Sequence, residues 1–241
     1  MIEIRSLSEL AEFSETLQLQ QKVWRYPDRD LFPERFFVVV SKTGGCVLGA
    51  YHGDELVGFS VAMPGVKPDG RPYWHSHMLA VLPQYRNSGV GRRLKLQQRE
   101  EGLRRGLELI EWTFNPLEVK NAFFNIERLG VIVRRYVENQ YGPSSSPLDG
   151  GLPTDRCIAE WWITSPRVVS VLEGRRTTHH PEEHVAVPVD IGRLRQEEPE
   201  RAREIQRSNA ARFQEYFLRG LAVTGFERTP SEGVYLLEPW E

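Results

Sequence analysis

The feature that most constrains this chain is a glycine-bearing junction between an apolar strand and a helix. It reads Val-Leu-Pro-Gln-Tyr-Arg-Asn-Ser-Gly-Val-Gly over residues 81–91. Gly89 and Gly91 remove side chains where a ligand would approach the main chain. A helix that begins near Ser88 directs its unpaired N–H groups and the positive end of its dipole toward that ligand. The junction therefore predicts an anion site suited to a pyrophosphate, with a glycine pair that only turns the chain as the alternative.

Two other phosphate-binding motifs are excluded by the residues around these glycines. A dinucleotide-binding turn has a third glycine three residues after the second, where this chain has Leu94. A Walker loop ends in Gly-Lys-Ser/Thr, and the corresponding residues here are Gly91, Arg92 and Arg93. What remains is an Arg-x-x-Gly-x-Gly turn, preceded by Leu79-Ala80-Val81-x-Pro83.

This segment resembles the coenzyme A loop of the GNAT N-acyltransferases. The resemblance covers residues 1–165 in element order, and its specific motif covers residues 74–130. It implies that acetyl-CoA or another acyl-CoA is the co-substrate, without a metal, and that main-chain N–H groups of the loop bind the pyrophosphate. The cofactor-binding residues implied here are Leu79, Ala80, Val81, Arg86, Asn87, Ser88, Gly89, Val90, Gly91 and Arg92.

The composition is ordinary for a globular protein, with 241 residues, 40% hydrophobic and 27% charged. A formal net charge of -2 gives no reason to expect nucleic acid or a membrane surface as a partner. Cys46 and Cys157 lack metal-site spacing, so we expect buried free thiols in a reducing compartment. The first residues do not read as a signal peptide, and no segment is apolar enough to cross a bilayer. We therefore expect a cytoplasmic protein.

The predicted elements follow the order of an α+β protein. Helices are expected from Ser8, which caps the first, and over residues 90–105, 118–129 and 199–218, with a further helical turn at Pro166 capped by Ser165. Loops are expected over residues 26–37, with a helical turn inside it, and over residues 139–154 and 175–183. The expected strands are residues 2–7, 46–51, 56–63, 74–81, 109–114, 131–137, 156–164, 185–189, 221–226 and 234–237.

The resemblance implies the GNAT fold for this order of elements. That fold has a central, mixed and mostly antiparallel sheet flanked by helices, and its two central strands, here residues 74–81 and 109–114, splay apart around the pantetheine arm. We predict an acyl-CoA-binding catalytic domain over residues 1–165. Residues 166–241 are predicted to form a strand-helix-hairpin extension packed on the same domain.

The strand before the loop carries His75 and His77, which the two-residue period of a strand places on one face. A histidine side chain has an ordinary pKa of about 6.5, so either ring can accept a proton near neutral pH. The His-x-His-x-Leu-Ala-Val pattern is similar to that of the arylalkylamine N-acetyltransferases, in which both histidines serve proton removal. We predict His75 and His77 as catalytic residues, with a hydrogen bond inside the sheet as the structural alternative.

Acyl transfer also needs stabilisation of an oxyanion and a proton for the departing thiolate. The resemblance implies that backbone N–H groups near Ala80 and Val81 polarise the thioester carbonyl. Many family members supply the proton from a tyrosine four residues before the glycine that ends the next helix, and that position is Ile126 here. The general acid is therefore unassigned. Nearby polar residues that do not match the motif are Asn125, Tyr136 and Tyr141.

Other polar residues are predicted to contact the substrates. Asn115 and Asn121 can hydrogen-bond the pantetheine arm, with turn or cap roles as the alternative. Arg134 and Arg135 alternate across a strand, so one is expected to face the cleft and hold a carboxylate while the other faces solvent. Arg156 joins them as a predicted substrate-binding residue.

Two further polar features are interpreted as structural. Glu160 is expected on a half-exposed strand face. His179, His180 and His184 have no cysteine or suitably spaced carboxylate beside them, so a solvated loop is favoured over a metal site.

The predicted function is transfer of an acetyl group from a CoA thioester to the amine of a small molecule, such as an amino acid, by direct attack in a ternary complex. Residues 125–130 and 151–156 also resemble a GNAT subgroup in which some members are associated with N-succinylation of amino acids, which makes succinyl-CoA an alternative donor. A non-catalytic acyl-CoA binding or sensing protein is the second hypothesis, since the family's tyrosine is absent. The acceptor and the oligomeric state, a homodimer included, stay open.

Overall fold

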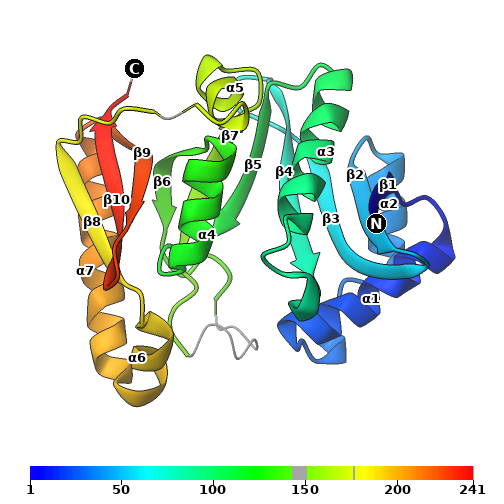
Figure 1. The fold of residues 1–241 in the computed structure, drawn as a ribbon, viewed down its shortest axis with the longest axis horizontal. Helices are drawn as coiled ribbons and strands as arrows, with labels where there is room; N and C mark the ends of the chain where they lie inside the picture. The colour runs from blue at the N-terminus through cyan, green and yellow to red at the C-terminus, as the bar shows by residue number, and fades with distance from the viewer. Residues whose placement is uncertain (143–150, 176, 241) are drawn as a thin grey trace. The chain divides into compact units, whose positions relative to one another are not determined.

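The structure is a computed structural model that describes residues 1–142, 151–175 and 177–240. The chain divides into two compact units, Met1–Trp112 and Thr113–Glu241 (Figure 1). This division falls inside a strand, whereas the sequence predicts a domain boundary at residue 165. That boundary stays a prediction.

The first unit is built on five strands in the order β1-β2-β3-β4-β5. Strands β1 to β4 are antiparallel neighbours, and β5 runs parallel to β4. The predicted hairpin between the second and third strands is confirmed, with Gly53 in its turn at a φ of 60°. The bounds are β1 Ile2–Ser6, β2 Cys46–His52, β3 Glu55–Val66, β4 Pro72–Val81 and β5 Leu109–Phe114.

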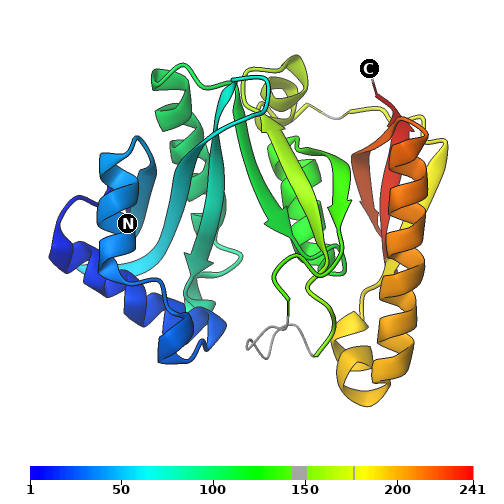
Figure 2. The ribbon, with the colours of Figure 1, turned by 180° about the vertical axis from the view of Figure 1, so that it is seen from behind.

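Helices cover both faces of this sheet. Helices α1 (Leu10–Trp24) and α2 (Glu34–Lys42) pack on one face, and α3 (Val90–Arg104) packs on the other, as the two views show (Figures 1 and 2). Two short 3-10 turns, η1 (Asp28–Asp30) and η2 (Pro83–Tyr85), precede α2 and α3.

Two predictions for the N-terminal region are wrong. The N-cap of α1 is Glu9 and not Ser8, because the Glu12 carboxylate reaches back to accept from the N–H groups of Ser8 and Glu9 at 2.8 and 3.0 Å. The predicted loop over residues 26–37 contains the expected helical turn, η1, but its end runs into α2, which was not predicted. The three consecutive valines in this helix favour a strand prediction, because β-branched residues are enriched in strands.

Strands β4 and β5 stay paired only near their first residues. The partners within the described residues are Trp74 with Ile110 and His75 with Glu111. Beyond them, β4 keeps its antiparallel partners on β3 up to Val81. This early end of the pairing agrees with the splay that was predicted for the two strands.

The second unit has strands in the order β7-β6-β9-β10-β8, each antiparallel to its neighbour. Helices α4 and α7 cover opposite faces of this sheet (Figures 1 and 2). Its strands are β6 Ile132–Val137, β7 Arg156–Trp162, β8 Glu183–Pro188, β9 Leu221–Arg228 and β10 Glu232–Pro239. Its helices are α4 Val119–Phe123, α5 Pro166–Leu172, α6 Ile191–Glu197 and α7 Pro199–Leu218, with a π-helical turn η3 at Phe124–Arg128.

Most predictions for this unit are confirmed, with two differences. The helix predicted over residues 118–129 is a short α-helix that widens into the π-helical turn before Gly130, whose φ is 76°. Helix α6 was missed by the sequence analysis. The predicted cap is present, since the Ser165 hydroxyl accepts from the N–H of Val168 at 3.3 Å.

The α+β fold class predicted from the sequence is confirmed. Cys46 and Cys157 are buried free thiols, as expected. Among the described residues, no helix has the length and apolar character needed to cross a membrane. Residues 143–150 of the predicted loop 139–154 lie outside the described residues.

Candidate active site

The two histidines of β4 share one face of the sheet, as the alternation predicted. Their ring centroids lie 5.7 Å apart. The residues between and beside them point to the other face and are buried, with Trp74 1%, Ser76 4% and Met78 6% exposed. His75 and His77 thus lie on the α1/α2 face of the sheet, and α3 packs on the opposite face.

His77 lies against two phenylalanine rings, one from the segment before α2 and one from α2 itself. Its ring centroid is 4.8 Å from that of Phe32 and 6.0 Å from that of Phe36. The backbone of Phe32 is fixed by the fully buried Gln20, whose side chain accepts from the Phe32 N–H at 2.9 Å and donates to its carbonyl at 3.1 Å. Burial in this apolar setting, with a smaller contribution from His75, lowers the pKa of His77 to about 4.

His75 lies at the last paired position of β4, next to Glu111 on β5. The Glu111 carboxylate is 5% exposed and accepts from the Lys67 ammonium at 2.5 Å. Burial lowers the pKa of His75, and the nearby charges of Lys95 and Lys67 lower it further. Both histidines are therefore neutral at pH 7 and free to accept a proton.

A buried lysine lies under the histidine strand, on the α3 face. Lys95 is 2% exposed, and its ammonium donates to the Ser76 hydroxyl at 2.7 Å and to the Gln98 side-chain oxygen at 3.2 Å. The same ammonium lies 3.5 Å from the centroid of the Trp112 ring. Burial lowers the pKa of Lys95 well below the usual value for lysine. The sequence analysis gave this residue no role.

The glycine loop is ordered by its own polar groups. The Arg86 side chain donates to the Val81 carbonyl at 3.2 Å, and the Ser88 hydroxyl donates to the Tyr85 carbonyl at 2.6 Å. Ser88 therefore lies in the turn, and α3 begins at Val90, as the helix predicted over residues 90–105 requires.

The first turn of α3 is open to a ligand. Its N-cap is Gly89, which has a φ of 86° and makes no side-chain cap. A Cβ atom built on Gly89 meets nothing within 4 Å, and one on Gly91 meets only side-chain carbons at 3.8 Å or more. Since the first N–H groups of a helix have no intrahelical partner, those of Val90 and Gly91 are available to an anion. The loop thus fits the pyrophosphate that the sequence predicts.

The backbone of β4 offers amide groups at its open edge. The Leu82 N–H donates to the Val57 carbonyl at 2.9 Å. By the two-residue alternation of an antiparallel pair, the Ala80 N–H also points to β3, and those of Leu79 and Val81 point away from it. Of the two amides predicted to polarise a carbonyl, that of Val81 has the required direction.

The predicted pantetheine ligands lie in the second unit. The Asn115 side-chain oxygen accepts from the Leu117 N–H at 2.9 Å, which is the turn role given as the alternative. Asn121 is exposed on α4. A contact of either residue with the cofactor stays a prediction.

The predicted opposite orientation of Arg134 and Arg135 is wrong. Arg134 donates to Glu160 at 2.6 Å, and Arg135 also pairs with this carboxylate, at 3.4 Å. The register of β6 against β7 shifts between Val133 and Tyr136, which breaks the simple alternation. Glu160 is only 3% exposed, so its expected half-exposed position is also wrong.

The third predicted substrate-binding arginine, Arg156, contacts other residues than Arg134 and Arg135 do. Arg156 donates to the Asp155 carbonyl at 2.9 Å, and its guanidinium lies 5.4 Å from the centroid of the Tyr141 ring. A role of the three arginines in substrate binding stays a prediction.

No described contact identifies the general acid. Ile126, at the position of the family's tyrosine, is fully buried in the π-helical turn. The Tyr136 hydroxyl donates to Asp155 at 2.7 Å, and burial together with this carboxylate raises the pKa of Tyr136. The Tyr141 hydroxyl lies 2.7 Å from the Thr113 hydroxyl.

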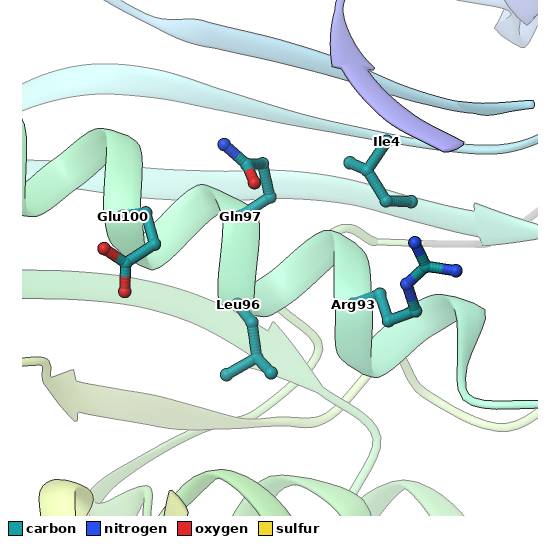
Figure 3. Close-up of a pocket in the computed structure, with 5 residues that line it drawn as sticks. All are labelled: Ile4, Arg93, Leu96, Gln97 and Glu100. Carbon is teal, nitrogen blue, oxygen red and sulfur yellow. The ribbon is translucent and has the colours of Figure 1, made fainter. Parts of the chain in front are cut away.

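Within residues 1–142, 151–175 and 177–240, no group of three or more His, Cys, Asp or Glu side chains is placed to hold a metal ion. A shallow pocket of about 280 Å³ lies between β1 and the exposed side of α3 (Figure 3). Its lining residues include none of the predicted site residues. They are Ile4, Arg93, Leu96, Gln97 and Glu100.

Comparison with known proteins agrees with this geometry. A model of the acetyltransferase (GNAT) family matches residues 10–130, which is about half of the chain. The protein therefore belongs to the GNAT acetyltransferase family, and residues 10–130 form its acetyltransferase domain. No curated protein matches the chain.

Solved structures share the fold at low sequence identity. The ribosomal-protein-S18-alanine N-acetyltransferase of Escherichia coli has a TM-score of 0.54 and 21% identity, over 68% of this chain and 96% of that one. An aminoglycoside 6'-acetyltransferase of type Ii has a TM-score of 0.53 and 20% identity, over 68% and 98%. Arabidopsis thaliana Naa50, solved with the bisubstrate analogue CoA-Ac-MVNAL, has a TM-score of 0.52 and 15% identity, over 66% and 97%. These similarities establish the fold.

Proposed function

We propose that this enzyme transfers an acetyl group from acetyl-CoA to the amine of a small molecule, with His75 and His77 removing the amine proton. One observation carries the proposal. The two histidines share a face of β4, and the same strand leads directly into the open loop at Gly89. A proton acceptor and an anion site are thus built into one continuous segment of chain.

The charge state of the histidines suits proton removal. An amine arrives at neutral pH as an ammonium ion and must lose a proton before its nitrogen attacks. Burial lowers the pKa of both rings, to about 4 for His77, so each is neutral at pH 7 and has a free ring nitrogen. A ring-to-ring centroid distance of 5.7 Å allows a water molecule to link them, so a proton taken up by one ring can pass to the other.

The acyl-CoA side of the reaction rests on the loop and on β4. The N–H groups of Val90 and Gly91 would hold the pyrophosphate, and the Val81 N–H would polarise the thioester carbonyl. The amine nitrogen then forms the new C–N bond, the C–S bond breaks, and the CoA thiolate takes a proton from solvent or from the returning histidinium. The resemblance to the family's pantetheine site supports this arrangement.

The acceptor is proposed to be a small amine, and an amino acid is kept as one form of it. Arg134 and Arg135 already share the buried Glu160, so a substrate carboxylate would have to compete with an internal one. Succinyl-CoA as the donor depends on the same arginines and on Arg156. We place the enzyme in the cytoplasm, which the two buried thiols support.

Free-thiol release tests the proposal directly. Purified protein is assayed with acetyl-CoA and succinyl-CoA against a panel of amines, amino acids and short peptides. We expect acetyl-CoA turnover with at least one small amine, and a loss of about 10²-fold to 10⁴-fold in kcat for His75→Gln or His77→Gln. The exposed His184 gives the matched control, His184→Gln, which should retain full activity.

Three outcomes would overturn parts of this proposal. Tight acetyl-CoA binding with no turnover on any acceptor would favour the non-catalytic acyl-CoA sensor. Turnover that is confined to peptides would replace the small-molecule acceptor. Full activity in both histidine variants would assign proton removal to solvent.

A further inference from the structure

Lys95 occupies the point at which β4 and β5 part. The last paired residues of the two strands are His75 and Glu111. The next residue on β4 is Ser76, and the next on β5 is Trp112. Lys95 contacts both of them, through a hydrogen bond of 2.7 Å to the Ser76 hydroxyl and through its position 3.5 Å from the Trp112 ring centroid.

The surroundings of Lys95 match an ammonium group in number and kind. An ammonium has three N–H donors and no acceptor. The Ser76 hydroxyl, the Gln98 side-chain oxygen and the electron-rich face of Trp112 supply three acceptors. Ser76 and Gln98 are at most 4% exposed, so little water competes for these contacts. Removing the ammonium would leave two buried polar groups without this donor.

Lys95 also connects the fork, which is the point where β4 and β5 part after His75 and Glu111, to the loop at Gly89. It lies on α3, five residues after Val90, which is about 8 Å along the helix axis. The helix that presents its first N–H groups at Gly89 is therefore the same helix that holds the two strands at their parting point. A shift of the helix would move the loop and the fork together.

We infer that Lys95 is a positioning residue for acyl-CoA, which fixes α3 against the fork between β4 and β5 and so sets the spacing of the strands that receive the pantetheine arm. This inference rests on the proposed function for its ligand. It assigns Lys95 no contact with the substrates, because Ser76 and Trp112 lie on the sheet face opposite the histidines.

The test compares Lys95→Met with the parent protein. Methionine has a similar length and fills the space of the Lys95 side chain, while the Ser76 hydroxyl and the Gln98 oxygen lose one donor. Arg104→Met is the matched control, since Arg104 lies on the same helix with its side chain 63% exposed. The readouts are the melting temperature, amide hydrogen exchange in β4 and β5, and acetyl-CoA affinity by calorimetry.

We expect Lys95→Met to fold, to exchange its Ser76 and Trp112 amides faster, and to lose about 10²-fold in kcat/KM for acetyl-CoA, the size of a misplacement by about 1 Å. Its acetyl-CoA affinity should fall, and the pKa of His75, followed by NMR, should rise because a nearby positive charge is gone. Arg104→Met should match the parent in every readout.

The results separate this inference from the proposed function. If the parent protein does not bind acetyl-CoA, the proposed function fails, and the inference that depends on it fails with it. If the parent binds acetyl-CoA and folded Lys95→Met binds it equally well, the inference alone is overturned. Faster exchange with unchanged affinity would have the same meaning, since Lys95 would then only stabilise the sheet.

Discussion

Placing one negative charge at the N-cap of α3 is the sharpest test of the anion site. The pair of variants is Gly89→Asp and Gly89→Asn, which have nearly the same shape and differ by one charge. A side chain at this position meets no atom within 4 Å of its Cβ, so neither variant creates a clash. Both residues tolerate the left-handed φ of 86° better than other non-glycine residues do.

The expected magnitude follows from the position of the charge. Two unit charges about 4 Å apart repel each other by about 1 kcal/mol in water and by about 4 kcal/mol at the effective dielectric constant of a protein surface. Relative to Gly89→Asn, the Gly89→Asp variant should therefore bind acetyl-CoA about fivefold to nearly 10³-fold more weakly. In the free protein the sign is reversed, because an acidic residue at a helix N-terminus stabilises the helix by about 0.3 to 1 kcal/mol.

Calorimetry with acetyl-CoA and a thermal melt of each variant make the measurement. Gly89→Asp should melt no lower than Gly89→Asn and yet bind the ligand more weakly. The difference in affinity should shrink at high salt, since exposed charges are screened. Equal dissociation constants in the two folded variants would refute the assignment of the loop as a pyrophosphate site.

Three further predictions concern stability and pH. His77 has a pKa of about 4 in the folded protein and about 6.5 when unfolded, so the unfolded chain binds more protons between these values. Thermal melts should therefore show stability falling as the pH drops from 6.5 toward 4. The variant His77→Phe should lose less stability over this pH range. Gln20→Leu should lower the free energy of unfolding in urea by about 1 to 3 kcal/mol, because the buried backbone groups of Phe32 lose their partner. Glu160→Gln should lower the same free energy by about 1.5 to 3 kcal/mol, as charge-assisted bonds to Arg134 are lost; an unchanged denaturation midpoint in either variant would contradict its argument.

The parts of the site that lie on one segment could be predicted from the sequence. A strand period of two residues is enough to place His75 and His77 on a common face. The glycine loop is likewise local, since strand, turn and helix follow one another along the chain. The helix predicted over residues 90–105 is observed from Val90 to Arg104, and the Ser88 hydroxyl bonds back into the turn before it.

The parts that depend on distant segments could not be predicted in this way. Phe32 lies against His77 while Gln20 holds its backbone through two hydrogen bonds, and nothing in the local sequence pattern indicates these contacts. Arg134 and Arg135 were assigned to opposite faces by simple alternation, which a β-bulge overrides. Glu160 did carry a signal, because a lone acid in an apolar strand indicates a buried charge with a partner, and this carboxylate is 3% exposed and pairs with Arg134 and Arg135.

Lys95 shows most clearly how a helical pattern conceals a polar contact. Its neighbour Leu94 is fully buried, but the residue one helical turn after Leu94 is the polar Gln98, so the apolar stripe of α3 is thin. In the sequence, Lys95 therefore resembles any solvated lysine on a helix. Only the sheet explains its burial. The alternation that brings the histidines to one face sends Ser76 to the other, and the same alternation on β5 sends Trp112 there, opposite Glu111. Wherever paired strands place functional groups on one face, the intervening residues are aimed at the covering helix, and the residue of that helix that meets them can control the spacing of the strands.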